Sequence, residues 1–152
     1  MIKVKSCLLI KGKSYEIGEY RGRVKDPDYI DGSLTLSIND NTIISSDMWD
    51  YIDQLWCYII NGLLEIKSDG IFTTFFPDQP IEMSLEKYNG VLTITIKTNT
   101  VYTEQVSWNE FLKGILPSAT LFWTRIVELA PSLTLLGEEM KEKISRLSLG
   151  IE

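Results

Sequence analysis

Three aspartates with helical spacing are the residues of this chain best placed to do chemistry. Asp47, Asp50 and Asp53 stand three apart, and Trp49 and Trp56 interleave with them. A hydrophobic wall raises the pKa of one carboxyl group while a better solvated neighbour stays ionised, and such a pair can act as acid and base or bind a divalent metal ion. The alternative is that carboxylates gather at a helix N-terminus because they complement the positive end of the helix dipole. We favour the second interpretation, which assigns no catalytic residue.

The absence of histidine limits the chemistry further. It removes Ser–His and Cys–His nucleophilic pairs, histidine metal ligands and the usual general base. Asp26, Asp28, Asp31 and Gly32 partly match a calcium-binding loop, but the third acid and the glycine are displaced by one position, and Ser37 stands where the loop needs glutamate. We therefore expect no metal site and no cofactor, and a non-enzymatic protein rather than an enzyme.

A second candidate feature is the segment FFPDQP, residues 75–80, in which Phe75 and Phe76 precede a stiff acidic turn. Aromatic anchors dominate the energetics of protein interfaces, so this segment could be a recognition loop. The alternative, which we favour, is that the two phenylalanines cap the core and the prolines close a tight bend. The candidate binding residues on the two features are Asp47, Asp50, Asp53, Phe76 and Asp78.

Cysteine usage and hydropathy indicate the compartment. Cys7 and Cys57 have no second cysteine at a metal-binding spacing, which predicts two free thiols in a reducing environment. The N-terminal apolar run is four residues long, too short for a signal peptide, and no stretch approaches the ~20 apolar residues of a membrane span. We expect a cytoplasmic protein that does not interact with membranes.

Length and charge narrow the class of partner. At 152 residues the chain fits one domain, and its 44% hydrophobic and 24% charged residues are ordinary globular values. The net charge of −6 disfavours nucleic acid, because affinity for phosphates comes largely from Lys and Arg. An acidic domain can instead meet a basic protein, since charge complementarity speeds encounter.

The aspartates belong to a predicted helix around which the rest of the chain is organised. Over Ser46–Leu64 the apolar residues recur at intervals of three and four, which indicates one buried amphipathic helix capped by Ser46. Trp49 and Trp56 stand seven apart and therefore lie on one side of such a helix. We expect them to anchor it on a sheet.

A hairpin at Asn89-Gly90 has a predictable register. This dipeptide is preferred in two-residue turns because both positions need positive φ. The resulting register gives one apolar and one polar face with a cross-strand ion pair. The predicted partners are Tyr88 and Val91, Leu85 and Ile94, Met83 and Ile96, Glu86 and Thr93, Ser84 and Thr95, and Glu82 and Lys97.

The remaining patterns complete an α+β fold. Ser107 and Glu110 form a capping box that begins a helix, whose periodicity continues through Pro117 as one kinked helix or two abutting helices; a last helix follows Pro131. We expect a single domain, residues 1–152, in which an antiparallel sheet is covered on one face by the central helix and the C-terminal helices. The further predicted strands are Ile2–Ile10, Ser14–Val24, Ser33–Ile38, Thr42–Ser45, Ile71–Phe76 and Val101–Val106.

Three functions remain open at this stage. The first is a protein-interaction or inhibitor module that binds a basic protein, since small acidic α+β domains without catalytic machinery are common among bacterial proteins that neutralise a partner, such as toxin-immunity proteins. This likeness is one of size and charge and is carried by no motif. Self-association is a further possibility. The alternatives are a carboxylate-dependent hydrolase that uses the acidic helix N-terminus and a carrier of an apolar small ligand.

Overall fold

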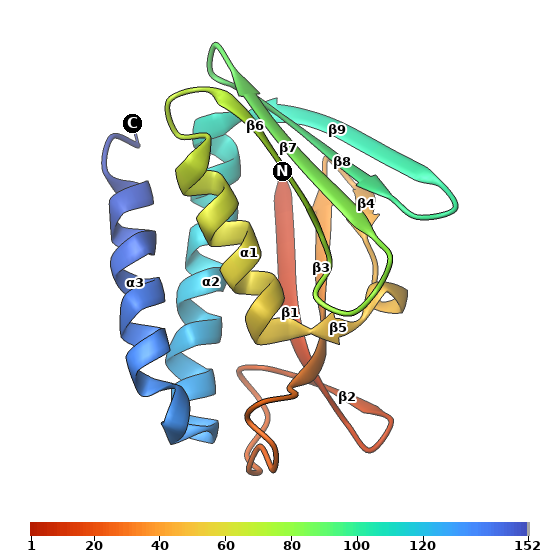
Figure 1. Cartoon of the computed structure of the whole chain (residues 1–152), viewed down its shortest axis with the longest axis vertical. Helices are drawn as coiled ribbons and strands as arrows, with labels where there is room; N and C mark the ends of the chain where they lie inside the picture. The colour runs from red at the N-terminus through yellow and green to blue at the C-terminus, as the bar shows by residue number, and fades with distance from the viewer. Residues whose placement is uncertain (152) are drawn as a thin grey trace.

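Two antiparallel sheets hold the strands of the computed structural model, which describes residues 1–151 (Figure 1). The first has the order β2-β1-β3-β4, and a short β5 pairs with β3. The second has the order β6-β7-β8-β9. The strands of the first sheet are β1 (Ile2–Ile10), β2 (Lys13–Glu16), β3 (Asp31–Ile38), β4 (Asn41–Ile44) and β5 (Asp50–Tyr51). Those of the second are β6 (Gly70–Phe75), β7 (Glu82–Tyr88), β8 (Val91–Lys97) and β9 (Val101–Ser107).

Three helices lie side by side and close the core (Figure 1). They are α1 (Ile52–Glu65), α2 (Trp108–Leu129) and α3 (Thr134–Ser148). α2 packs on β1, α3 packs on α1 and α2, and α1 contacts β3 of one sheet and β6 of the other. The predicted α+β class is confirmed, but the strands divide into two sheets rather than one. None of the helices in residues 1–151 is long and apolar enough to cross a membrane.

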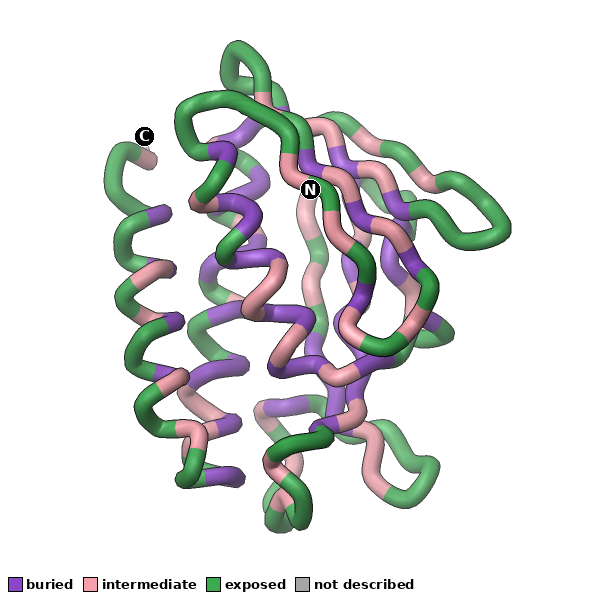
Figure 2. Tube along the Cα trace, viewed as in Figure 1, coloured by how far each residue is buried: buried purple, intermediate pink, exposed green. Residues whose placement is uncertain are grey.

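The β7–β8 hairpin has the predicted register at every position. Asn89 and Gly90 have φ of 49° and 79°, the positive values that a tight hairpin turn needs. All the predicted cross-strand partners are paired. On the outer face Lys97 Nζ lies 3.7 Å from Glu82 Oε1. The inner face of the sheet is part of the buried core, visible in Figure 2 as buried positions that alternate mainly with intermediate ones along β7 and β8.

The central helix is shorter than the sequence predicted. Residues Ser46–Met48 form a short 3₁₀ turn, Asp50–Tyr51 is extended, and the helix begins only at Ile52. The prediction of one helix over Ser46–Leu64, capped by Ser46, is therefore wrong at its N-terminal end. The physical reason is strand pairing: Asp50 lies opposite Gly32 of β3, so its backbone follows the sheet rather than its own helical periodicity.

Gly32 makes this pairing possible. A Cβ at this position would collide with the carbonyl oxygen of Cys7 and would lie 2.8 Å from Cγ2 of Ile52. The absence of a side chain therefore lets the start of α1 approach β3 and β1 closely. Both neighbours are in the middle of the core, so neither can move away at little cost.

The two tryptophans have different environments. Trp56 is completely buried, its ring centroid lies 6.2 Å from that of Phe122 in α2, and its indole N–H donates to Ser6 Oγ at 2.9 Å. Ser6 is a polar residue among the apolar residues of one face of β1. It is buried because its hydroxyl accepts the hydrogen bond from this indole. Trp49, by contrast, is 44% exposed, so the prediction that it anchors the helix is wrong.

Two other predictions are settled by the structure. The Ser107 half of the capping box is confirmed, because Ser107 Oγ accepts from the amide of Glu110 at 3.0 Å. The Glu110 half is not, since the Glu110 carboxylate lies 3.3 Å from the amine of Met1 instead. α2 then continues through Pro117 as a single helix. The predicted strand Ser14–Val24 is wrong beyond Glu16. After β2 the chain turns, and the amides of Glu19 and Tyr20 both donate to the carbonyl of Glu16.

Replacement of Trp56 by alanine should lower the free energy of unfolding by about 3–5 kcal/mol, since it leaves a large cavity in the core. Ser6→Ala should lower the free energy of unfolding by about 1–3 kcal/mol, because it leaves the buried indole N–H without an acceptor. Trp49→Ala is the matched control and should change stability by less than about 0.5 kcal/mol. Urea denaturation followed by circular dichroism measures all three. A near-neutral Trp56→Ala would contradict the packing described here.

Candidate functional site: an acidic and aromatic surface

A buried carboxylate organises the region that the sequence had singled out. Asp50 is only 1% exposed, and its oxygens accept three backbone N–H groups: Tyr51 at 2.7 Å, Asp78 at 3.0 Å and Gln79 at 2.9 Å. The side-chain amide of Gln79 in turn donates to the carbonyl oxygen of Trp49 at 2.7 Å. Asp50 therefore holds the loop between β6 and β7 against β5, and this accounts for its burial without any chemistry.

The loop separates the two phenylalanines that precede it. Phe76 is buried, and its amide donates to the carbonyl of Ile81 at 2.8 Å, which closes the bend. It caps the core as predicted. Phe75 is exposed on the outer face of the second sheet, opposite Glu82 of β7. The prediction that both rings cap the core is therefore wrong for Phe75.

Around this loop the structure gathers residues that are far apart in the sequence. The rings of Tyr29 and Tyr51 lie with centroids 5.6 Å apart. Burial, followed by the negative charges of Asp50 and Asp78, raises the pKa of Asp31. Burial, with Asp78 as the largest of the charges that add to it, also raises the pKa of Tyr51. We call this region the acidic aromatic surface and define it by Asp28, Tyr29, Asp31, Trp49, Tyr51 and Asp78.

Sequence reasoning missed most of this surface. It named Asp78, but it treated Asp28 and Asp31 only as a failed calcium loop and assigned no role to Tyr29 or Tyr51. No spacing in the sequence links these residues, because they meet only through the pairing of β3 with β5, in which Asp31 lies opposite Tyr51.

Asp53 points inward rather than to the surface. It lies in the first turn of α1, is 6% exposed, and its Oδ1 has no hydrogen-bond partner among residues 1–151. Burial raises the pKa of this carboxyl group from its ordinary value of 3.8, and the charge of Asp28 adds to the shift. The position of Asp53 fits the helix-dipole interpretation, but its burial means that it faces no solvent-borne partner directly.

Asp47 borders a hollow that none of the residues defining the acidic aromatic surface lines. It is exposed in the 3₁₀ turn Ser46–Met48 and shares this shallow hollow with Gln79, Pro80 and Tyr102. The three aspartates of the predicted helix therefore have three different environments. The structure brings only Asp50 together with Asp78.

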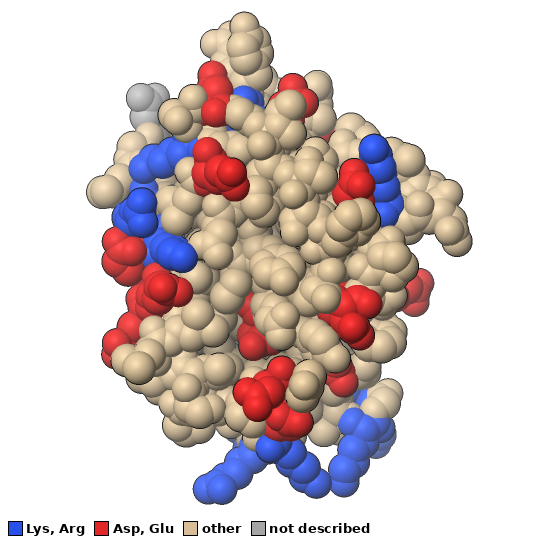
Figure 3. All heavy atoms as spheres, in the orientation of Figure 1, with Lys and Arg blue, Asp and Glu red and all other residues tan. Residues whose placement is uncertain are grey.

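The carboxylates of this region have no internal counter-charge. None of Asp28, Asp31, Asp47, Asp50, Asp53 and Asp78 forms an ion pair with a cation of residues 1–151. Acidic side chains are visible over the middle of the face formed by α1, β5 and the β6–β7 loop (Figure 3). Within the same residues, no group of three or more acidic or cysteine side chains is arranged to hold a metal ion. The arrangement is suited to receiving positive charge from outside.

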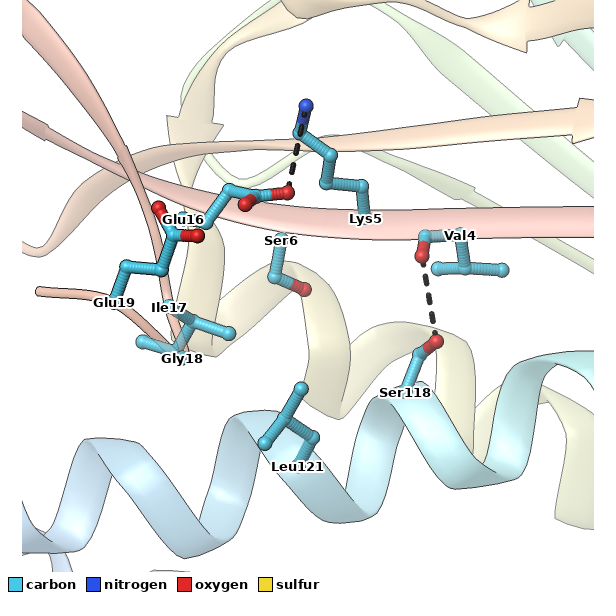
Figure 4. Close-up of a pocket in the computed structure, with 9 residues that line it drawn as sticks. All are labelled: Val4, Lys5, Ser6, Glu16, Ile17, Gly18, Glu19, Ser118 and Leu121. Carbon is cyan, nitrogen blue, oxygen red and sulfur yellow. Dashed lines mark hydrogen bonds and ion pairs between the residues drawn. The ribbon is translucent and has the colours of Figure 1, made fainter.

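A small pocket elsewhere offers little for catalysis. Figure 4 shows β1 facing Ser118 and Leu121 of α2 across a space of about 180 Å³, below the ~300 Å³ of typical ligand sites. Most of its polar side chains already have partners: Ser118 Oγ donates to the carbonyl of Val4 at 3.4 Å, Lys5 pairs with Glu16 at 3.5 Å, and Ser6 Oγ accepts from Trp56. We interpret this pocket as a packing gap.

The cysteines are both free, as predicted. Cys7 is buried in β1 and Cys57 is half-buried in α1. Burial, with a contribution from Asp53, raises the pKa of the Cys57 thiol to about 12. The thiolate, which is the reactive form, is therefore scarce at neutral pH.

No protein-family model, curated protein or solved structure matches this chain. The geometry of residues 1–151 is therefore the basis for assigning a function.

Replacement of Asp50 by asparagine should lower the free energy of unfolding by about 2–3 kcal/mol, because an amide has one acceptor oxygen where the carboxylate has two charged ones. Hydrogen exchange should quicken at the amides of Asp78 and Gln79, which donate to Asp50. Asp47→Asn is the matched control, since Asp47 is exposed and should be neutral in both measurements. Unchanged exchange at the two amides would contradict the anchoring role.

Replacement of Asp53 by asparagine should change the pH dependence of stability. Because the pKa of Asp53 is raised in the native state, the native protein retains this proton above pH 3.8, where the unfolded chain loses it. The contribution of Asp53 to stability therefore falls as pH rises through the raised pKa. Asparagine does not ionise, so the variant should gain stability relative to the original protein between acidic and neutral pH in urea titrations. A constant difference across that range would show that the carboxyl group is not desolvated.

Proposed function

We propose that this protein is a non-enzymatic interaction or inhibitor module that binds a basic protein through the acidic aromatic surface. The observation that carries the proposal is the presence of exposed aromatic rings next to carboxylates that have no counter-charge of their own. Tyr29 is 62% exposed and lies against the ring of Tyr51, and Trp49 is 44% exposed and accepts through its carbonyl oxygen from Gln79 of the loop that carries Asp78.

The residue types support this proposal. Tyrosine and tryptophan supply large contact areas at a low cost in side-chain entropy, and they are enriched among the residues that dominate binding energy. The ring of Tyr51 lies near Asp31 and Asp78, and the ring of Tyr29 lies against that of Tyr51. A lysine or arginine of a partner could therefore stack on a ring and pair with a carboxylate in the same contact.

The rigidity of the surface also supports it. Asp50 fixes the loop that carries Asp78, and the pairing of β5 with β3 fixes the backbone of Tyr51. A partner would therefore meet a surface that has little conformational entropy left to lose, which increases affinity for the same contacts. Burial raises the pKa of Asp31 most, and the charges of Asp50 and Asp78 add to it; an approaching cation would offset the contribution of these charges.

The hydrolase hypothesis has less support. An acid and base pair needs two carboxyl groups that can exchange protons with a bound substrate. Both oxygens of Asp50 face backbone N–H groups, and Asp53 is turned into the protein. Asp47, the remaining member of the predicted trio, borders the hollow lined by Gln79, Pro80 and Tyr102.

The proposal predicts the behaviour of two matched double variants used as tagged bait in lysate of the source organism. Tyr29→Ala with Asp78→Asn removes one exposed ring and one carboxylate from the acidic aromatic surface. It should weaken capture of the partner at least about tenfold, as expected when a central aromatic contact is lost. Tyr88→Ala with Asp40→Asn removes the same groups from elsewhere, since Tyr88 is 73% exposed at the β7–β8 turn, and should leave capture unchanged.

The captured protein, identified by mass spectrometry, should carry net positive charge, and its affinity should fall as salt is raised. A partner that both double variants retain equally would contradict the proposed surface. Salt-independent binding would contradict the electrostatic basis of the interaction.

A further inference from the structure

Basic residues are concentrated at one end of this acidic protein. Five of the 15 Lys and Arg residues lie in the short stretch 11–25. None of the five forms an ion pair with a carboxylate of residues 1–151. In Figure 3 basic side chains gather at the lower end of the molecule. The five residues are Lys11, Lys13, Arg21, Arg23 and Lys25.

A cleft opens beside these cations. It lies between the end of β1 and the segment that leads into β3, and its volume is about 370 Å³, within the range of small-molecule sites. Lys11, Arg23 and Lys25 border it. The apolar and aromatic residues that line it are Leu9, Ile10, Tyr20, Val24, Tyr29 and Ile30.

The walls of the cleft are tied to the body of the protein. Arg125 of α2 donates to the carbonyl oxygens of Ile17 and Tyr20, and the amide of Val24 donates to the carbonyl of Leu129 at 3.4 Å. Ile30, on the other wall, accepts from the first amide of α1 at 3.0 Å. These bonds anchor the segment at both ends, so the cleft exists before any ligand enters.

Asp26 and Asp31 also line the cleft, but neither forms an ion pair with Lys11, Arg23 or Lys25. Asp26 accepts the amide of Asp28 at 3.1 Å, which shapes the turn. Asp31 lies close enough to Asp50 and Asp78 for their charges to raise its pKa, so it belongs to the acidic aromatic surface. The cleft therefore combines an apolar interior with a border of three cations and two carboxylates, on which the cations are in the majority.

We propose that this cleft binds a small organic anion, with its apolar body against Ile10, Val24 and Ile30 and its carboxylate, sulfonate or phosphate group at Arg23 and Lys25. This site is separate from the acidic surface proposed for protein binding, whose chemistry is opposite in sign. Tyr29 and Asp31 belong to both: each lines the cleft, the ring of Tyr29 lies against that of Tyr51, and Asp31 lies near Asp50 and Asp78.

The test compares an anionic and a neutral fluorescent probe of similar shape, 8-anilinonaphthalene-1-sulfonate and N-phenyl-1-naphthylamine. The natively folded full chain should bind the sulfonate at one site and more tightly than the neutral probe. Arg23→Gln with Lys25→Gln should weaken the sulfonate about tenfold. Lys113→Gln with Lys141→Gln changes the net charge equally at positions outside the cleft and should have no effect.

A third variant, Val24→Trp, fills the apolar part of the cleft and keeps every charge; it should weaken both probes. If Val24→Trp does not fold, the comparison of the two double charge variants decides the test. The proposal is overturned if the native protein does not bind the sulfonate, if both charge variants weaken it equally, or if a folded Val24→Trp protein binds as before.

Discussion

The close approach of β5 and α1 to β3 at Gly32 is the constraint on which the functional surfaces depend. Only a residue without a side chain fits between the carbonyl of Cys7 and the side chain of Ile52. This approach pairs Asp50 with the sheet, points its carboxylate at the β6–β7 loop, and starts α1 at Ile52. The buried carboxylate of Asp50 then accepts hydrogen bonds from three backbone N–H groups in place of water, and these bonds offset the free-energy cost of its burial.

The charge of this protein is divided between two regions. The acidic aromatic surface and the cleft adjoin at the segment that enters β3, where Tyr29 and Asp31 belong to both. A net charge of −6 therefore describes neither region well. Local charge decides which molecules bind at a given place, whereas net charge mainly influences solubility and long-range attraction. The two proposals of opposite sign are compatible for this reason.

The extent to which the sequence predicted the structure follows from the range of the interactions involved. The Asn89-Gly90 hairpin and the Ser107 N-cap depend on neighbours within a few residues, and both were predicted correctly. The candidate site depends on β3 pairing with β5, between residues about twenty apart in the chain, and on a carboxylate that reaches a loop 28 residues further on. Asp50 and Asp78 were named as candidates, but nothing in their spacing indicated that they touch.

The sequence by itself determined the α+β class, the hairpin register, the start of α2 and the burial of Trp56, because turn chemistry, capping and apolar periodicity are local properties. Tertiary structure alone decided that the helical pattern at Trp49 and Asp50 gives way to an extended strand, that Asp53 is buried, and that Tyr29, Tyr51 and Asp31 meet. The physical reason is that the polar and apolar pattern of residues 46–51 is compatible with both a helix and an edge strand. The free backbone groups of β3, together with the space at Gly32, decide between them.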